Sequence, residues 1–269
     1  MKLKLSLKVS GSLKAIPRYK FFAAGIASAF IIALIVVAYF RSGNVDKSLA
    51  AAPAANLNQA RNGTDPAPTT PVQWVNGNLG GSQAHYIEGM SVPYQCVMTD
   101  LVIGTQVTLI IGYDVMNSSK HAFDYLTHYN RLTPHSFLNH STQEAIDPLA
   151  GTGLAAGTAF STYAIPAPSS AGSPVPGQPT TSFNSLPAAQ KLMTLYNGNI
   201  DTIYYSIQGN LTASQSETQI VVKFKPTAAT AVLIWGGHIG SRSDWGYTSG
   251  NPNSAGGISG SPFHMRLIS

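Results

Sequence analysis

Two short segments combine histidine and aspartate in patterns that suit metal binding or acid–base chemistry. His121 and Asp124 stand three positions apart, and His238 precedes Asp244 on a turn rich in glycine and serine. His264 adds a further imidazole. A zinc site or a related metal site needs three or four such side chains at one point. These residues are therefore candidates for a metal or ligand site. We expect no cofactor, with calcium as the one alternative.

The same side chains also have a purely structural explanation. On a regular strand His121 and Asp124 point to opposite faces, so they converge only if the segment is helical or bulged. Otherwise they hydrogen-bond loop backbone and cap turns. The sequence contains no nucleophile elbow, zinc-protease motif or phosphate loop, and no carboxylate pair recognisable as a glycosidase dyad. We expect no enzymatic activity, and a hydrolase is the second alternative.

Aromatic side chains next to this turn offer a different binding chemistry. Trp245 and Tyr247 lie in a loop rich in Gly, Ser and Asn, and aromatic faces on exposed loops stack on sugar rings. The first alternative function is thus a glycan- or metal-binding module that uses the loop 238–247 together with His121 and Asp124. In this interpretation Trp245 and Tyr247 form an exposed platform.

The elements that must position these residues are predicted to be strands. The chain is 44% hydrophobic and has 25 Gly and 17 Pro among 269 residues, which favours short strands joined by turns over a helical bundle. Alternating apolar residues predict half-buried strands at 107–115 and 220–225, and the apolar run 231–235 suits a central strand. Asn197-Gly198 between the apolar runs 192–196 and 200–207 is typical of a β-hairpin.

A long proline-rich stretch separates the two halves of this pattern. Between residues 132 and 186 the prolines at 166, 168, 174, 176 and 179 exclude a central strand, so we expect an insertion that wraps the domain. The predicted fold is all-β, an antiparallel β-sandwich of jelly-roll or immunoglobulin type with this insertion. Cys96 is the only cysteine, and its alternating apolar surroundings predict a buried, inert thiol.

The N-terminal segment predicts the compartment. Residues 1–20 hold six Lys/Arg and form a basic cytoplasmic tail, and residues 21–40 are uncharged and long enough for a transmembrane helix. Residues 41–71 read as a flexible linker and residues 72–269 as an exported β domain. A retained anchor is expected, with cleavage near the alanines at 50–55 as the alternative.

Charge argues against nucleic acid as a partner. The formal net charge of +5 arises from residues 1–40, because residues 41–269 hold ten Lys/Arg against eleven Asp/Glu. The exported part therefore lacks the basic excess that nucleic-acid binding requires. The expected partners are the membrane, through residues 21–40, and other surface proteins or glycans.

Five strings in order carry a resemblance to a known group of proteins. They resemble the successive signatures of a β-rich domain of bacterial cell-surface proteins, often large ones with immunoglobulin-like or collagen-adhesin-type modules. The strings are Trp74–Leu79, Glu88–Tyr94, Lys120–Leu126, Trp235–Gly246 and Ile258–Leu267. The resemblance implies a surface-exposed domain of adhesin or structural type and assigns no catalytic residue. The sequence ends soon after the last string, so we expect an open strand edge that a partner could fill.

These observations predict a single-pass membrane protein with a cytoplasmic N-terminus. It would display one β domain at the cell surface for adhesion or envelope structure, a role that could include assembly with other surface proteins.

Overall fold

The computed structural model of this chain describes residues 51–131, 135–169, 172, 175–259 and 263–269. The expected basic tail (1–20) and transmembrane helix (21–40) lie outside these residues. Among the described residues, no helix has both the length and the apolar character needed to span a membrane.

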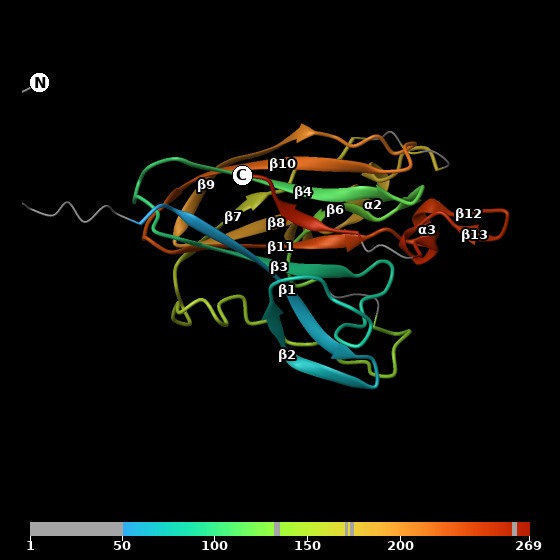
Figure 1. Ribbon diagram of the computed structural model, residues 1–269, viewed down its shortest axis with the longest axis horizontal. Helices are drawn as coiled ribbons and strands as arrows, with labels where there is room; N and C mark the ends of the chain where they lie inside the picture. Colours follow the sequence, from blue (N-terminus) through green and yellow to red (C-terminus); the bar gives the residue numbers. More distant parts are fainter. Residues whose placement is uncertain (1–50, 132–134, 170–171, 173–174, 260–262) are drawn as a thin grey trace, which may run out of the picture. The chain divides into compact units, whose positions relative to one another are not determined.

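Within the described part the fold is all-β, with two main antiparallel sheets and few helices (Figure 1). The seven-stranded sheet has the order β2-β1-β3-β11-β8-β7, and β6 also pairs with β11. Its strands are β1 (Ala54–Thr64), β2 (Ala67–Val75), β3 (Ser91–Thr99), β6 (Phe123–Thr127), β7 (Phe160–Ala164), β8 (Leu192–Tyr196) and β11 (Ala231–Ile239).

The five-stranded sheet has the order β14-β4-β10-β9, and β5 also pairs with β4. Its strands are β4 (Val107–Asn117), β5 (Lys120–His121), β9 (Gly198–Ile207), β10 (Ser216–Pro226) and β14 (Met265–Leu267). Short elements complete the described part: α2 (Thr180–Ser185), η1 (Ala188–Lys191), α3 (Arg242–Trp245), η2 (Ala255–Gly257) and the two-stranded ribbon β12 (Tyr247–Thr248) with β13 (Asn251–Pro252).

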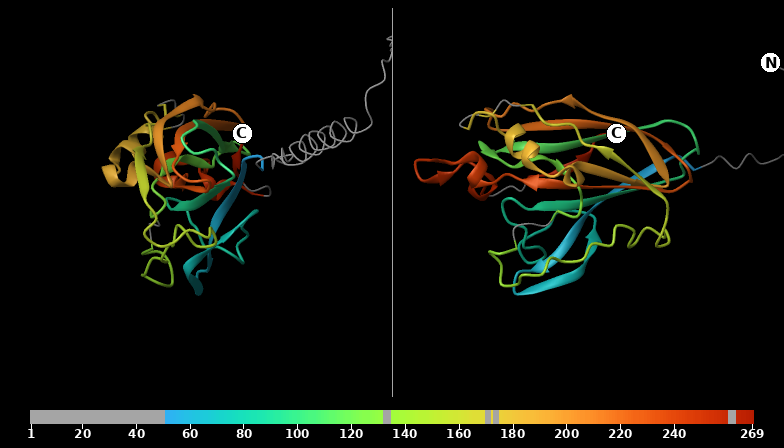
Figure 2. Two further views of the ribbon diagram at one scale, coloured as in Figure 1. Left: turned by 90° about the vertical axis from the view of Figure 1, so that its left-hand side faces the viewer. Right: turned by 180° about the vertical axis from the view of Figure 1, so that it is seen from behind.

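One hydrophobic core contains side chains from both main sheets, which face each other in Figures 1 and 2. The predicted inward residues of β10, Ile220, Val222 and Phe224, are fully buried, and Leu109, Ile111 and Tyr113 of β4 are buried with them. Every residue of β11 is buried, because β11 lies between β3 on one side and β8 and β6 on the other. The three predicted strands are therefore confirmed.

The predicted hairpin at Asn197-Gly198 is wrong, although both of its strands exist. β8 pairs with β11 and β7 in the seven-stranded sheet, whereas β9 pairs with β10 in the other sheet. A two-residue hairpin of the common type needs left-handed backbone at both turn residues. Asn197 has φ 56°, but Gly198 is not among the residues with positive φ. The turn therefore carries the chain from one sheet to the other.

The predicted linker 41–71 is also wrong over residues 54–71, which form β1 and most of β2. β1 pairs with β3 from Ala54 opposite Thr99 to Gln59 opposite Tyr94, and it pairs with β2 on its other side. β2 is the edge strand, β1 lies next to it, and both bury few side chains. An edge strand tolerates the prolines of β2, and because little of either strand is buried, apolar periodicity is missing here.

The proline-rich stretch between 132 and 186 contributes no central strand, as expected. Its described part supplies β7, the last strand of the seven-stranded sheet, and α2. Cys96 on β3 is fully buried, and burial raises the pKa of its thiol to about 12. The expected inert thiol is consistent with this environment.

The close approach of β6 to β11 requires glycine at position 236. A Cβ at Gly236 would lie 2.5 Å from Oγ1 of Thr127 and 2.8 Å from the carbonyl oxygen of His128. We predict that Gly236→Ala lowers the free energy of unfolding by about 1–3 kcal/mol, as overpacking typically does. Urea denaturation measures the change. Gly80→Ala is the control because no atom lies within 4 Å of its Cβ position; equal stability of the two variants would contradict the packing argument.

Candidate metal centre

A β-bulge brings the first group of predicted site residues together. Tyr125 lies opposite His238 and Phe123 lies opposite Ile239, so Asp124 is the extra residue on β6. A bulge turns the extra residue away from regular alternation. We expected His121 and Asp124 to converge only in a helical or a bulged segment, and the segment is bulged.

Asp124 is the centre of this buried group. Its Oδ1 accepts a hydrogen bond from the indole Nε1–H of Trp245 at 2.6 Å, and its Oδ2 lies 3.1 Å from Nδ1 of His238. The ring of His121 stacks on Trp245 with centroids 3.4 Å apart and planes 4° apart. Burial raises the pKa of Asp124, and the hydrogen bonds from His238 and Trp245 partly oppose that rise.

The six predicted ligand-binding residues thus separate into two sets. His121, Asp124, His238 and Trp245 meet in the interior. Asp244 instead belongs to the start of α3, where its Oδ2 accepts a hydrogen bond from Ser241. Tyr247 is exposed on β12. The expectation of an exposed Trp245–Tyr247 platform is wrong, because Trp245 is fully buried beneath His121.

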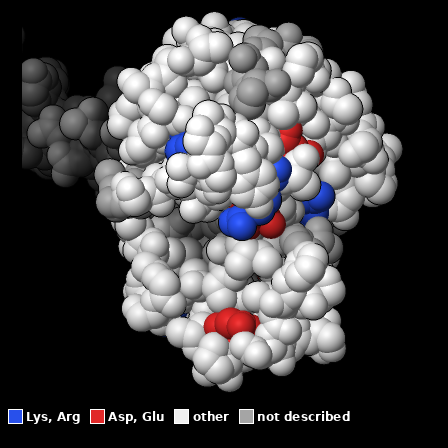
Figure 3. All heavy atoms as spheres, turned by 90° about the vertical axis from the view of Figure 1, so that its right-hand side faces the viewer, with Lys and Arg blue, Asp and Glu red and all other residues white. Residues whose placement is uncertain are grey.

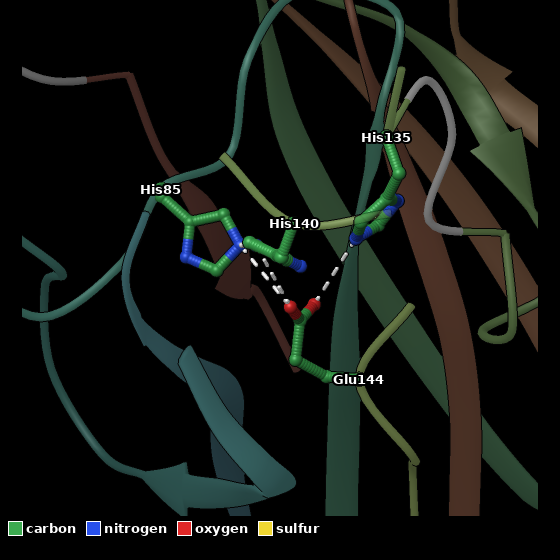
Figure 4. Close-up of side chains that lie close together, drawn as sticks. All are labelled: His85, His135, His140 and Glu144. Carbon is green, nitrogen blue, oxygen red and sulfur yellow. Dashed lines mark hydrogen bonds and ion pairs between the residues drawn. The ribbon is translucent and has the colours of Figure 1, made fainter. Parts of the chain in front are cut away.

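A second cluster, not foreseen from the sequence, has the composition of a metal centre. It consists of His85, His135, His140 and Glu144, and one ligand atom from each lies within 4.8 Å of all the others. Figure 4 shows the three imidazoles turned toward the carboxylate of Glu144. The Glu144 side chain is only 1% exposed, and those of His85, His135 and His140 are 5%, 9% and 16% exposed.

Several separations are close to the edge of a tetrahedral coordination shell, within a cluster whose ligand atoms all lie within 4.8 Å of one another. Metal–ligand bonds of about 2.0–2.1 Å at a tetrahedral zinc ion place neighbouring ligand atoms about 3.3 Å apart. The Nε2 atoms of His85 and His140 lie 3.2 Å apart. Oε1 of Glu144 lies 3.3 Å from Nε2 of His85 and 3.4 Å from Nε2 of His140, and its Oε2 lies 3.4 Å from Nε2 of His135.

Hydrogen bonds outside the cluster set the tautomers of two rings. Nδ1 of His85 lies 2.8 Å from the carbonyl oxygen of Gly63, and Nδ1 of His140 lies 3.0 Å from that of Thr142. A carbonyl oxygen only accepts, so each Nδ1 carries a proton. In the neutral rings the lone pair of Nε2 therefore points inward, as it does in histidines that bind metals.

Asn62 is hydrogen-bonded to two residues of the cluster. It is fully buried, and its Oδ1 accepts a hydrogen bond from the backbone N–H of His85 at 3.1 Å. This contact leaves its amide Nδ2 facing inward, 3.1 Å from Nε2 of His85 and 3.4 Å from Oε2 of Glu144. Asn62 thus holds the backbone at His85 and offers a donor to the carboxylate, as residues around metal ligands commonly do.

The ligands come from loops that the β1–β2 hairpin holds together. His85 lies between β2 and β3, and the other three ligands lie in the proline-rich insertion. Gly63 donates a backbone hydrogen bond to Gln83. On the other side the backbone N–H groups of Asn139 and Ala145 donate to the side chains of Asp65 and Thr70. The strands that the sequence did not predict are therefore the ones that build this site.

The donor set indicates a transition metal. Three imidazole nitrogens and one carboxylate oxygen suit Zn²⁺ or another first-row divalent ion. Calcium prefers six to eight oxygen ligands, so this cluster is a poor match for the calcium kept open from the sequence.

No protein family, curated protein or solved structure matches the chain in comparisons of sequence and fold. The function must therefore be argued from the chemistry of the two clusters.

Asp124 accepts two buried hydrogen bonds, and an asparagine provides only one acceptor atom. We predict that Asp124→Asn lowers the free energy of unfolding by about 1–3 kcal/mol, because one buried donor then loses its partner. Urea denaturation followed by tryptophan fluorescence measures the loss. Asp201→Asn on the exposed face of β9 is the matched control. A loss of the same size in both variants would mean that the contacts of Asp124 do not stabilise the fold.

Proposed function

We propose that this protein is a metal-binding β-domain whose ion is held by His85, His135, His140 and Glu144. The observation that carries the proposal is the approach of three Nε2 atoms to one buried carboxylate at 3.3–3.4 Å.

Electrostatics favours a metal ion over an ion-pair cluster without one. In the neutral rings, the Nε2 lone pairs of His85 and His140 lie 3.2 Å apart next to a carboxylate, and they repel one another. A divalent ion would provide one centre of positive charge that the carboxylate and the inward lone pairs of His85 and His140 can all bind.

The arrangement supports a structural role for the ion. Four protein ligands complete a tetrahedral shell, whereas catalytic zinc sites usually keep one position for water. The ion would join the loop between β2 and β3 to the proline-rich insertion. This role agrees with the expectation of a protein that is not an enzyme, which we keep as part of the proposal.

We place this domain at the cell surface, in an adhesive or envelope-structural role. Support comes from the sequence alone, namely the basic residues 1–20 and the apolar residues 21–40. The two sheets with a shared core support the finer proposal of a sandwich of jelly-roll or immunoglobulin type.

Metal binding is tested with the full-length protein after treatment with a chelator. We predict that Zn²⁺ binds at one equivalent in isothermal titration calorimetry. Glu144→Gln and His140→Ala should each weaken binding more than about a hundredfold, since even residues that only support a ligand contribute 10- to 100-fold.

His264→Gln is the matched control, because His264 is partly exposed and pairs with Asp114 away from the cluster. Binding that survives the cluster variants, or that falls equally in the control, would refute the assignment of the ligands.

Removal of the metal should loosen the joined loops without unfolding the sheets. Free Zn²⁺ at a hundred times its dissociation constant stabilises the folded state by about 2.7 kcal/mol, so we predict that Tm rises by about 5–10 °C relative to the chelated protein. Hydrogen exchange should quicken most around residues 80–90 and 135–147 and least in β10 and β11. An equal change across all strands, or none, would contradict a local cross-link.

A further inference from the structure

A cavity of about 1000 Å³ lies beside α3 and is separate from the proposed metal ligands. Figure 3 views the molecule from the side on which α3 lies in Figure 1, and it shows Lys/Arg and Asp/Glu side chains close together near the middle of a largely uncharged face. The volume is at the upper end of the range of small-molecule sites. The polar groups that line it are His238, Arg131, Asp244, Glu88 and Arg242.

The buried Asp124 fixes the orientation of the His238 ring at the cavity wall. Nδ1 of His238 is turned to Asp124, and the Tyr125 ring stacks on the imidazole with centroids 4.4 Å apart. The ring is therefore fixed in place. Because His238 lines the cavity, its Nε2 is the nitrogen left to accept a hydrogen bond there.

The charges that line the cavity cancel. Glu88 and Arg242 form an ion pair, and Glu88 also accepts hydrogen bonds from Ser254 and from the backbone of Gly256. The second opposite pair, Arg131 and Asp244, forms no ion pair among the described residues. The guanidinium of Arg131 donates to the carbonyl oxygen of Gly89, and Asp244 accepts from Ser241. The cavity thus offers strong donors and strong acceptors without an excess of either charge.

Aromatic side chains supply the remaining walls. Tyr86, Phe137 and Phe263 line the same cavity, and Phe137 is 79% exposed. A polar ligand with an apolar face would stack on such rings while its hydroxyl groups reach the charged residues.

We propose that this cavity binds a neutral saccharide. Hydroxyl groups both donate and accept, so they match Asp244 and Nε2 of His238 as acceptors and Arg131 as donor. A charged ligand would bring its charge close to a residue of the same sign, either Arg131 or Asp244, and the two would repel. None of the four metal ligands lines the cavity, but Tyr86 and Phe137 belong to the loops that the proposed ion would join.

The test is saturation-transfer difference NMR on the full-length protein with single sugars. The neutral set is the methyl glycosides of glucose, galactose, mannose and N-acetylglucosamine, and the charged set is glucuronic acid and glucosamine. We expect transfer to at least one neutral sugar and to neither charged sugar. Asp244→Asn and Arg131→Gln should each weaken binding of that sugar by about tenfold, as loss of a charged hydrogen bond does.

Asp201→Asn and Lys223→Gln, on the other sheet, are matched controls and should leave binding unchanged. All measurements are repeated with a chelator present, and sugar binding that still depends on Asp244 and Arg131 without metal separates this proposal from metal binding. Transfer to no neutral sugar, binding of charged sugars alone, or binding that ignores Asp244 and Arg131 would each overturn the proposal.

Discussion

The carboxylate of Glu144 is almost completely shielded from water, and a buried negative charge must be matched by positive charge or by hydrogen-bond donors. Three imidazoles and the amide of Asn62 surround it. They come from loops that are distant in sequence, so their meeting depends on the β1–β2 hairpin that holds those loops. The proposed divalent ion would supply that positive charge.

The other buried carboxylate, that of Asp124, is matched by hydrogen bonds within the core. Its two oxygens face an indole N–H and an imidazole nitrogen, both supplied by residues near the end of β11 or in α3. The bulge on β6 makes these contacts possible. The protein thus contains one carboxylate matched by hydrogen bonds within the core and one matched by three histidines at its periphery. The first fixes His238 at the wall of a cavity, and the second joins loops.

The sequence predicted the central strands well because their residues alternate or are continuously apolar, as in β4, β10 and β11. It also named four residues of the Asp124 group, since His121 and Asp124 are close in sequence, as are His238 and Trp245. It could not place β1 and β2, because both strands are mostly polar and bury few side chains, and β2 is an edge strand that contains two prolines. It also missed the crossing at Asn197-Gly198, where the backbone angle of one glycine decides between a hairpin and a change of sheet.

The cluster around Glu144 was missed for a related reason. His85 lies 50 positions before His135, and nothing local shows that the β1–β2 hairpin brings them together. A signal was present in His135, His140 and Glu144, because three potential metal ligands, two of them histidines, within ten residues are unusual in a chain with only seven histidines. That signal lies in the proline-rich stretch, which has no periodic pattern that would show which side chains meet.

The most direct test of the proposed metal centre is X-ray absorption spectroscopy at the zinc edge on the full-length protein loaded with one equivalent of Zn²⁺. The account predicts a four-coordinate ion with nitrogen and oxygen ligands at about 2.0–2.1 Å and the outer-shell scattering of three imidazole rings. A spectrum with six oxygen ligands, or without imidazole scattering, would show that these residues do not hold the ion.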